Sequence, residues 1–306
     1  MRILFMGTPD FAVASLRRLV EDGHEICGVL TQPDKPKNRG HKLTPTPVKE
    51  YAITNSLDVY QPATLRNAES LELVRSLEPE LIVVAAYGKL LPEDILNVPP
   101  LGSINVHSSL LPKYRGAAPI NWALLDGEPE TGVTIQYMAA ELDAGDILLQ
   151  KSTPIGDTED AQALTERLAQ LGAEALSETV AALAAGTASR TPQDHARHTY
   201  APKLGKGLSP VDWTCSAHEI SCQIRGLIPW PCAVTDVISG EEIKLYAVQE
   251  TGEKTLARPG VITAAGKQGI DIACGDGKVL RVTELQAKGG KRMTAAAYLL
   301  GHPIQR

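Results

Sequence analysis

Apolar and polar positions in the first 190 residues follow two alternating periods, which predict short strands separated by helices. Nearly continuous apolar runs are typical of strands buried on both faces of a parallel sheet, and they occur at 2–6, 26–31 and 81–86. Apolar positions spaced by three or four residues predict helices at 48–56, 68–77, 119–125 and 160–184. The first strand turns at Gly7 into another helix. This order predicts an α/β fold with a doubly wound, mostly parallel sheet.

The pattern breaks between Gly186 and Gly207, where prolines and glycines interrupt the apolar positions and predict a linker. Beyond it, a helix at 218–226 precedes short apolar runs separated by glycine turns, which suggests a small β-barrel. We therefore expect one domain at 1–189, a linker at 190–207 and a second domain at 208–306.

Charge is distributed unevenly along the chain. Residues 1–200 hold 17 Lys and Arg against 26 Asp and Glu, whereas residues 201–306 hold 13 against 10. The basic excess in the second part hints at a polyanionic partner, although an ordinary solvated surface explains it nearly as well.

The remaining composition excludes several classes of protein. The five cysteines form neither a Cys-x-x-Cys pair nor a zinc-ligand spacing, so we expect reduced thiols in a cytoplasmic protein and no metal. No apolar run approaches the length of a membrane span, and no signal peptide precedes the strand that begins at Arg2. The lone Gly7 is not the dinucleotide-binding fingerprint, so no dinucleotide is predicted.

Candidate chemistry begins with Asn105 and His107, at the end of a predicted strand over 103–107. Residues two apart on a strand share a face, so the amide and the imidazole project together. Both can donate hydrogen bonds to a carbonyl oxygen that gains negative charge. Two satisfied polar residues at a strand end are the alternative, and the pair alone favours that alternative.

An acidic turn follows at 141–146, between two strands predicted at 132–138 and 147–152. Asp143 in this turn could orient His107 and relay a proton. Taken alone, it is more simply an ordinary acidic turn residue.

A proline-rich segment at 32–47 carries four cations and one acid, Asp34. It is longer than most connecting loops, which favours a functional segment, and its prolines exclude a helix or a central strand. A functional loop and a solvated surface loop are equally compatible with these residues.

Three motifs resemble, in order and spacing, the 10-formyltetrahydrofolate-dependent formyltransferases. They are Asn105-x-His107, Ser-Leu-Leu-Pro at 109–112, and Leu-Asp-x-Gly-Asp at 142–146. Further similar stretches lie at 5–12, 32–40 and 131–134. The resemblance is specific in the first half of the chain and weak in the second.

The resemblance implies an activity. A formyl group would pass from N10 of 10-formyltetrahydrofolate to the free amino group of methionine on initiator methionyl-tRNA, for translation initiation, without a metal. Asn105 and His107 would donate hydrogen bonds to the formyl oxygen, and His107 with Asp143 would move the proton.

The resemblance also implies binding residues and partners. The folate cosubstrate would contact Gly88, Leu90, Ser109, Leu110, Leu111 and Pro112. The tRNA would contact Lys35, Lys37, Arg39, Lys42, Lys203 and Lys206. The second domain would be a tRNA-binding barrel similar to oligonucleotide-binding (OB) folds. We expect a monomer that does not engage a membrane.

Several alternatives share the chemistry or the scaffold. Glycinamide ribonucleotide formyltransferases resemble only the first domain, and formyltetrahydrofolate dehydrogenases need a longer chain. Sugar-nucleotide formyltransferases can carry a second domain, but the basic loop and the charge balance oppose them. A non-catalytic RNA-binding protein need not keep all three candidate catalytic residues, and a dehydrogenase needs the missing fingerprint. The chain departs from the family pattern at Asn38 and Cys232, where glycine is expected.

Overall fold

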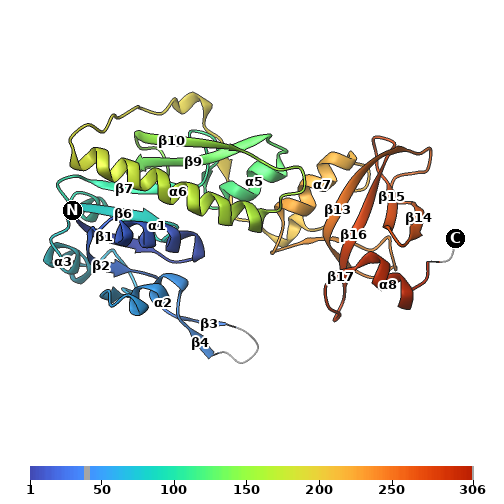
Figure 1. Cartoon of the computed structure of the whole chain (residues 1–306), viewed down its shortest axis with the longest axis horizontal. Coiled ribbons are helices and arrows are strands. Elements are labelled where there is room, and N and C mark those ends of the chain that lie inside the picture. Colours follow the sequence, from blue (N-terminus) through green and yellow to red (C-terminus); the bar gives the residue numbers. More distant parts are fainter. Residues whose placement is uncertain (38–41, 305–306) are drawn as a thin grey trace. The chain divides into compact units, whose positions relative to one another are not determined.

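The computed structural model describes residues 1–37 and 42–304 (Figure 1). The chain forms two compact units, which are described separately. The first comprises residues 1–116, 132–153 and 165–200, and the second comprises 117–131, 154–164 and 201–306.

The first unit is built on a seven-stranded sheet with the order β10-β9-β7-β6-β1-β2-β5. The pairs from β7 through β5 are parallel, and β9 runs antiparallel to β7. This confirms the predicted mostly parallel sheet. The strands are β1 (Arg2–Gly7), β2 (Glu25–Leu30), β5 (Val59–Tyr60), β6 (Leu81–Ala85), β7 (Ser103–His107), β9 (Glu130–Tyr137) and β10 (Ile147–Pro154).

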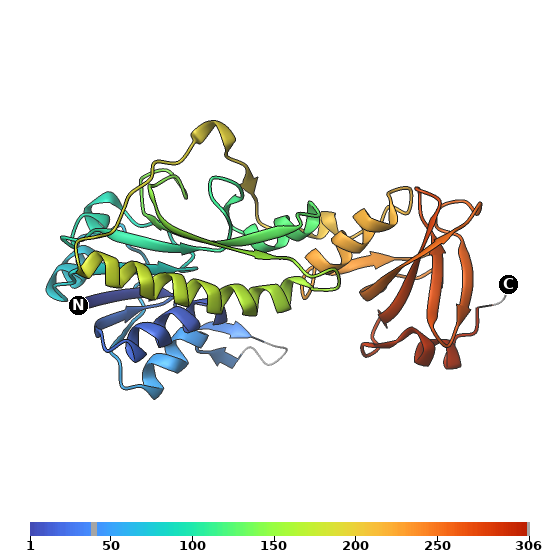
Figure 2. The same ribbon diagram turned by 45° about the horizontal axis from the view of Figure 1, so that its top comes forward.

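Helices lie against both faces of this sheet (Figure 2). On one face, Gly172 of α6 lies close to Val106 of β7 and to Phe11 of α1. The opposite face carries an apolar cluster that α3 and α4 complete. The helices are α1 (Asp10–Glu21), α2 (Pro47–Thr54), α3 (Ala68–Ser76), α4 (Glu93–Leu96) and α6 (Ala161–Ala184).

The proline-rich segment forms a two-stranded antiparallel ladder of β3 (Lys35–Lys37) and β4 (Lys42–Thr44). Prolines are tolerated in such an isolated edge pair because half of its backbone groups face outward. Asn38 and Arg39 lie outside the described residues. Thr46 then caps α2 by accepting a hydrogen bond from the Lys49 backbone.

The second unit contains a six-stranded sheet with the order β12-β13-β16-β15-β14, and β17 pairs with β16. All pairs with a defined register are antiparallel. The strands are β12 (Ala233–Thr235), β13 (Ile243–Lys254), β14 (Ile262–Gly266), β15 (Gly269–Ala273), β16 (Lys278–Ala287) and β17 (Met293–Thr294), with helices α7 (Ala217–Gly226) and α8 (Ala295–Gly301).

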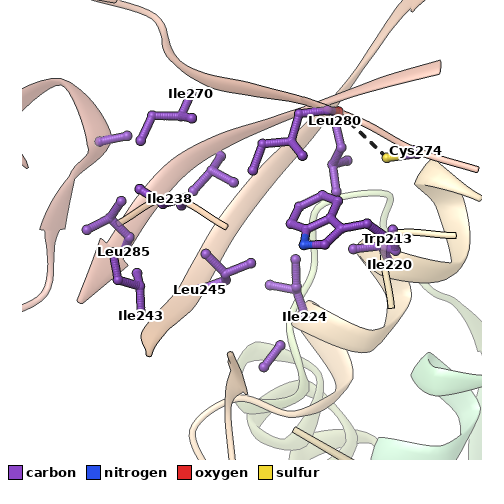
Figure 3. Close-up of a cluster of buried hydrophobic side chains, with 14 of the residues drawn as sticks. Trp213, Ile220, Ile224, Ile238, Ile243, Leu245, Ile270, Cys274, Leu280 and Leu285 are labelled. Atoms are coloured by element: carbon purple, nitrogen blue, oxygen red, sulfur yellow. Dashed lines mark hydrogen bonds between the residues drawn. The ribbon is translucent and has the colours of Figure 1, made fainter. Parts of the chain in front are cut away.

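A buried cluster around Trp213 forms the core of this unit (Figure 3). It joins the apolar face of α7, through Ile220 and Ile224, to inward-facing residues of β13 and β16 such as Leu245. The Trp213 indole donates a hydrogen bond to the Thr235 hydroxyl at 2.9 Å, so its one polar atom is satisfied.

Helix α5 (Pro119–Leu125) also belongs to the second unit, although it precedes β9 in the chain. The Asn121 side chain donates to the Gly226 carbonyl at 2.7 Å, and the Trp122 indole donates to the Pro202 carbonyl at 2.8 Å. Cys232 in the same unit has a φ of 66°, in the left-handed region that favours glycine. This backbone geometry explains why glycine suits that position.

Candidate active site

Strand β7 carries Asn105 and His107 on the sheet face that α3 and α4 cover. Asn105 pairs in register with Val84 of β6 and with Gln136 of β9, so these side chains project to the same side. In residues 1–37 and 42–304, the Asn105 amide makes no side-chain hydrogen bond, and it lines a cleft. Asn105 therefore offers an open donor to a molecule bound there.

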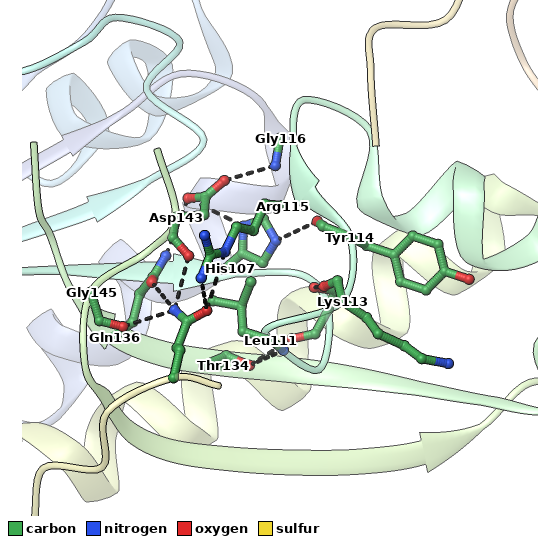
Figure 4. A network of polar contacts seen from close by, with 12 residues as sticks. His107, Leu111, Lys113, Tyr114, Arg115, Gly116, Thr134, Gln136, Asp143 and Gly145 are labelled. Atoms are coloured by element: carbon green, nitrogen blue, oxygen red, sulfur yellow. Dashed lines mark hydrogen bonds and ion pairs between the residues drawn. The ribbon is translucent and has the colours of Figure 1, made fainter. Parts of the chain in front are cut away.

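The His107 ring is 5% exposed and is held from two sides (Figure 4). Its Nε2 donates to the Tyr114 carbonyl at 2.9 Å, and this nitrogen must carry the hydrogen because a carbonyl only accepts. Its Nδ1 lies 3.6 Å from Oδ1 of Asp143. The imidazole thus presents one edge to the backbone and the other to the carboxylate.

Asp143 lies in the loop that follows β9 and lines the cleft. Its Oδ2 accepts from the Gly116 backbone N–H at 2.9 Å, and its Oδ1 accepts from the Gln136 amide at 3.1 Å. The loop is tightly folded: a Cβ on Gly145 would lie 1.9 Å from the Tyr137 carbonyl oxygen. Asp143 itself has a φ of 52°. Both carboxylate oxygens therefore act as acceptors in a fixed orientation.

Three further residues complete this polar network, and none was predicted from the sequence. Gln136, Arg115 and Gln193 are 1%, 0% and 5% exposed, respectively. Gln136 is a polar residue inside an apolar strand, which is a usable sequence signal. Gln193 falls within the predicted linker, where no sequence pattern marks it.

The cleft has a volume of about 630 Å³. This is within the ~300–1,000 Å³ typical of small-molecule sites. Its apolar wall contains Leu65, Leu71, Leu90, Leu91 and Met138, and its polar side contains Asn67, Lys89, Asn105, Gln136 and Asp143. It lies at the carboxyl ends of β6 and β7, where ligands bind in open α/β sheets.

Lys89 places a cation in the wall of this cleft. Its ammonium donates to the Ala63 carbonyl at 3.0 Å. Burial, with a smaller contribution from Lys35, lowers the pKa of Lys89. The described residues contain no group of three His, Cys, Asp or Glu side chains that could hold a metal ion.

The six residues predicted to contact folate occupy different places. Leu90 lines the cleft, and Gly88 lies two positions before it, with a φ of 78°. The segment 109–112 is not among the cleft-lining residues and instead shapes the turn that leads to Tyr114. In that turn the Ser109 hydroxyl donates to the Lys113 carbonyl at 2.7 Å, and the Leu111 N–H donates to Thr134 at 3.1 Å. Leu110 and Pro112 are half-buried.

The cations predicted to contact RNA fall into two groups. Lys35, Lys37 and Lys42 lie in the β3–β4 ladder, and the Lys35 ammonium donates to the Gln32 side chain at 3.1 Å. Arg39 lies outside the described residues. Lys203 and Lys206 are exposed in the second unit.

Comparison with known proteins places these features in context. A family model described as formyl transferase matches residues 1–180, and one described as formyl transferase, C-terminal domain, matches residues 203–303. A methionyl-tRNA formyltransferase of Geobacter sulfurreducens is 48% identical to this chain, and the matched region spans 100% of this chain and 95% of that relative. A methionyl-tRNA formyltransferase of Bacillus subtilis is 45% identical to this chain, and the matched region spans 99% of this chain and 96% of that relative.

Solved structures share the fold at lower identity. An N-formyltransferase from Helicobacter canadensis, in complex with folinic acid and dTDP-3-aminofucose, has a TM-score of 0.70 at 19% identity and covers 92% of this chain and 98% of that one. HypX from Aquifex aeolicus, in complex with tetrahydrofolic acid, has a TM-score of 0.64 at 20% identity. The match spans 98% of this chain and 47% of the HypX chain.

Proposed function

The chain belongs to the formyltransferase family, and we propose that it transfers a formyl group from 10-formyltetrahydrofolate to the amino group of methionine on initiator methionyl-tRNA. This reaction prepares the initiator tRNA for translation, in the cytoplasm. The observation that carries the proposal is the unpaired Asn105 amide in a cleft beside the His107–Asp143 pair, in a chain similar to such enzymes over its whole length.

The cosubstrate supplies an electrophilic formyl carbonyl, and the chain supplies a donor and a proton path. When the amine attacks the formyl carbon, negative charge develops on the formyl oxygen. The Asn105 amide can donate to that oxygen because the described residues give it no competing partner. Removal of one such donor from an enzyme typically costs about 10²–10³ in rate.

The proton lost by the amine must reach the departing N10. Asp143 reaches the cleft, whereas both nitrogens of His107 are directed at protein oxygens. We therefore assign proton transfer to the His107–Asp143 pair acting as one unit, with Asp143 as the member that lines the cleft. We thus propose the same three catalytic residues as were predicted from the sequence, but with Asn105 rather than both Asn105 and His107 as the donor to the formyl oxygen.

The folate proposal follows the lining of the cleft. The apolar side around Leu90 would pack against the flat ring of the cosubstrate, and Gly88 would keep the backbone turn open. Ser109, Leu110, Leu111 and Pro112 would act from behind, because their turn carries the Tyr114 carbonyl that holds His107.

Positive charge, together with the exposure of Lys35, Lys203 and Lys206, supports contact with tRNA. Lys35, Lys37, Arg39 and Lys42 would contact the acceptor end from the first unit, and Lys203 and Lys206 would contact phosphates from the second. The pairing of the long strands β13 and β16 contains register shifts, and such shifts bend strands. This curvature supports the proposal of an OB-like barrel that binds tRNA. We propose domains at 1–189 and 208–306 joined by 190–207, in a monomer.

Product analysis tests this function. The protein would be incubated with 10-formyltetrahydrofolate and, separately, with methionyl-tRNA, glycinamide ribonucleotide or an amino-sugar nucleotide. We expect formylation of methionyl-tRNA alone. Preferred formylation of the amino-sugar nucleotide would overturn the assignment of the acceptor and favour the alternative with a second domain.

A further inference from the structure

The segment that leaves α6 returns to the active site and places a buried glutamine there. Gln193 lies between the two family matches, which end at residue 180 and resume at 203, and it is 5% exposed. Residues 165–200 belong to the first compact unit. This segment is therefore part of the fold that surrounds Asp143.

The Gln193 amide makes contacts on both of its ends. Its Oε1 accepts from Nη2 and Nε of Arg115 at 2.8 and 3.2 Å. Its Nε2 donates to the Gln136 Oε1 at 3.1 Å, and to the backbone carbonyls of Asp143 at 2.9 Å and Gly145 at 2.8 Å. Gln193 thus ties the Asp143 loop to Arg115.

Arginine fixes the direction of these contacts because a guanidinium only donates. Arg115 therefore requires the oxygen of Gln193 on its side, which turns the Gln193 NH₂ towards Gln136. Gln136 must then present its oxygen to Gln193 and its own NH₂ to Oδ1 of Asp143, at 3.1 Å. The polarity of two successive amides is set by one cation.

Arg115 is held firmly enough to serve this role. It is fully buried, and its guanidinium also contacts Glu141 through Nη1 at 3.3 Å and Nδ1 of His195 through Nη2 at 3.1 Å. His195 belongs to the same segment as Gln193, in η1 (His195–Arg197). Both sides of the guanidinium are thus anchored by the segment and the Asp143 loop.

We propose that Gln193 is a positioning residue for formyl transfer, which acts through Gln136 to hold the Asp143 carboxylate as an acceptor directed at His107. The inference rests on the proposed function, because Asp143 needs this orientation only if protons move at that site. Neither Gln193 nor Arg115 needs to touch a substrate for this role.

The isosteric change Gln193→Glu tests whether the orientation of the Gln193 and Gln136 side-chain amides matters. The introduced carboxylate can still accept from Arg115, but it cannot donate to Gln136 or to the Asp143 carbonyl. Gln136 would then rotate to donate to the introduced carboxylate and would turn its own oxygen towards Asp143. The Asp143 carboxylate would lose the Gln136 donor and face an acceptor in its place.

The experiment measures kcat, KM for both substrates and Tm for the wild type, Gln193→Glu and a control. Gln170→Glu is matched, because it adds the same charge on an exposed position of α6. We expect Gln193→Glu to lower kcat about tenfold or more while both KM values stay within about threefold, as for a group that acts on the chemical step. Gln170→Glu should match the wild type.

Each other outcome is decisive. An unchanged kcat in Gln193→Glu, or a raised KM with an unchanged kcat, would overturn the inference while the proposed function stands. If the wild type itself transfers no formyl group to methionyl-tRNA, both fail. If Gln193→Glu does not fold, Gln136→Met removes the same donor from Asp143 and leaves Arg115 paired; a wild-type kcat there overturns the inference.

Discussion

The imidazole of His107 lies between two oxygens, with Nδ1 3.6 Å from the Asp143 carboxylate and Nε2 2.9 Å from the Tyr114 carbonyl. Because Nε2 donates to a carbonyl and Nδ1 faces a carboxylate, both ring nitrogens are directed at protein oxygens. Asn105 is therefore the donor that faces the cleft.

Removal of either Asn105 or His107 should slow the chemical step. Asn105→Ala and His107→Ala are each expected to lower kcat about 10²-fold or more, through loss of an oxyanion donor or a proton carrier. Equilibrium binding of folate should change little, because the apolar wall is untouched. Wild-type turnover in a correctly folded His107→Ala protein would exclude His107 from the chemistry.

Asp143→Asn should also be slow, although the substitution is nearly isosteric. Both oxygens of Asp143 accept, from Gly116 and from Gln136, so an amide must turn its NH₂ towards one of these donors. We expect kcat to fall at least about tenfold and its pH profile to change. An unchanged profile would reduce Asp143 to a turn residue.

Tyr87 should make the stability of the folded protein depend on pH in alkaline solution. Its hydroxyl is buried without a hydrogen-bond partner among the described residues, and burial raises its pKa to about 12. The folded state therefore holds this proton more tightly than the unfolded state, in which the pKa is about 10. The resulting stability of about 2–3 kcal/mol is present below pH 10 and lost between pH 10 and 12.

Tyr87→Phe should remove that loss. Chemical denaturation between pH 9 and 12 should show a smaller decline for the variant than for the wild type, and equal or slightly higher stability at pH 7, because an unpaired buried hydroxyl costs about 1–3 kcal/mol. Exposed Tyr200→Phe serves as the control. Parallel declines in all three proteins would contradict the burial of an unpaired hydroxyl.

The length of a truncated protein should decide whether the site survives. The backbone and hydroxyl of Thr199 bond to the backbone of Arg115 and Tyr114 at 2.9 and 2.8 Å. A chain ending at Arg190 lacks Thr199, which holds the turn at Tyr114, so it should bind folate more weakly than a chain ending at Ala201. Both should lose most tRNA affinity. Fluorescence titration with folate compares them, and equal affinities would show that 191–201 is dispensable.

Arg39 should affect both binding and turnover of the tRNA. A bidentate contact with the acceptor end would align the amine, so Arg39→Ala should raise KM for tRNA and lower kcat. Lys35→Ala and Lys37→Ala should act mainly on affinity, each lowering the salt slope by about one unit at most. Kinetics across a salt series measure this. If the constants and the slope of Arg39→Ala match the wild type, the segment is a surface loop.

Regular elements were predictable because burial leaves a period in the sequence. The strand over 103–107 and the helix over 119–125 have the predicted bounds, and 81–86 differs by one residue. The helices α4 and α8 were not predicted, because α4 has only four residues and α8 begins with three alanines, which mark no polar face. The β3–β4 ladder was also not predicted, because its prolines conceal it.

The site was predictable only where a motif carries it. Asn105, His107 and Asp143 do come together in space. Arg115 and Gln193 are 78 residues apart in sequence, and their contact depends on the path of the chain after α6. No local pattern encodes such a long-range polar contact, because its energy comes from burial that only the tertiary structure creates.

Each compact unit is built from three separate stretches of the chain, and this limits how the protein could be recombined with its relatives. A chimera cut between the two family matches would keep α5 with the N-terminal parent, although α5 packs on α7 of the C-terminal parent. A chimera joined between the two family matches would therefore pair α5 of one parent with α7 of the other, even if every catalytic motif came from one parent. A working chimera should therefore take both α5 and α7 from the same parent.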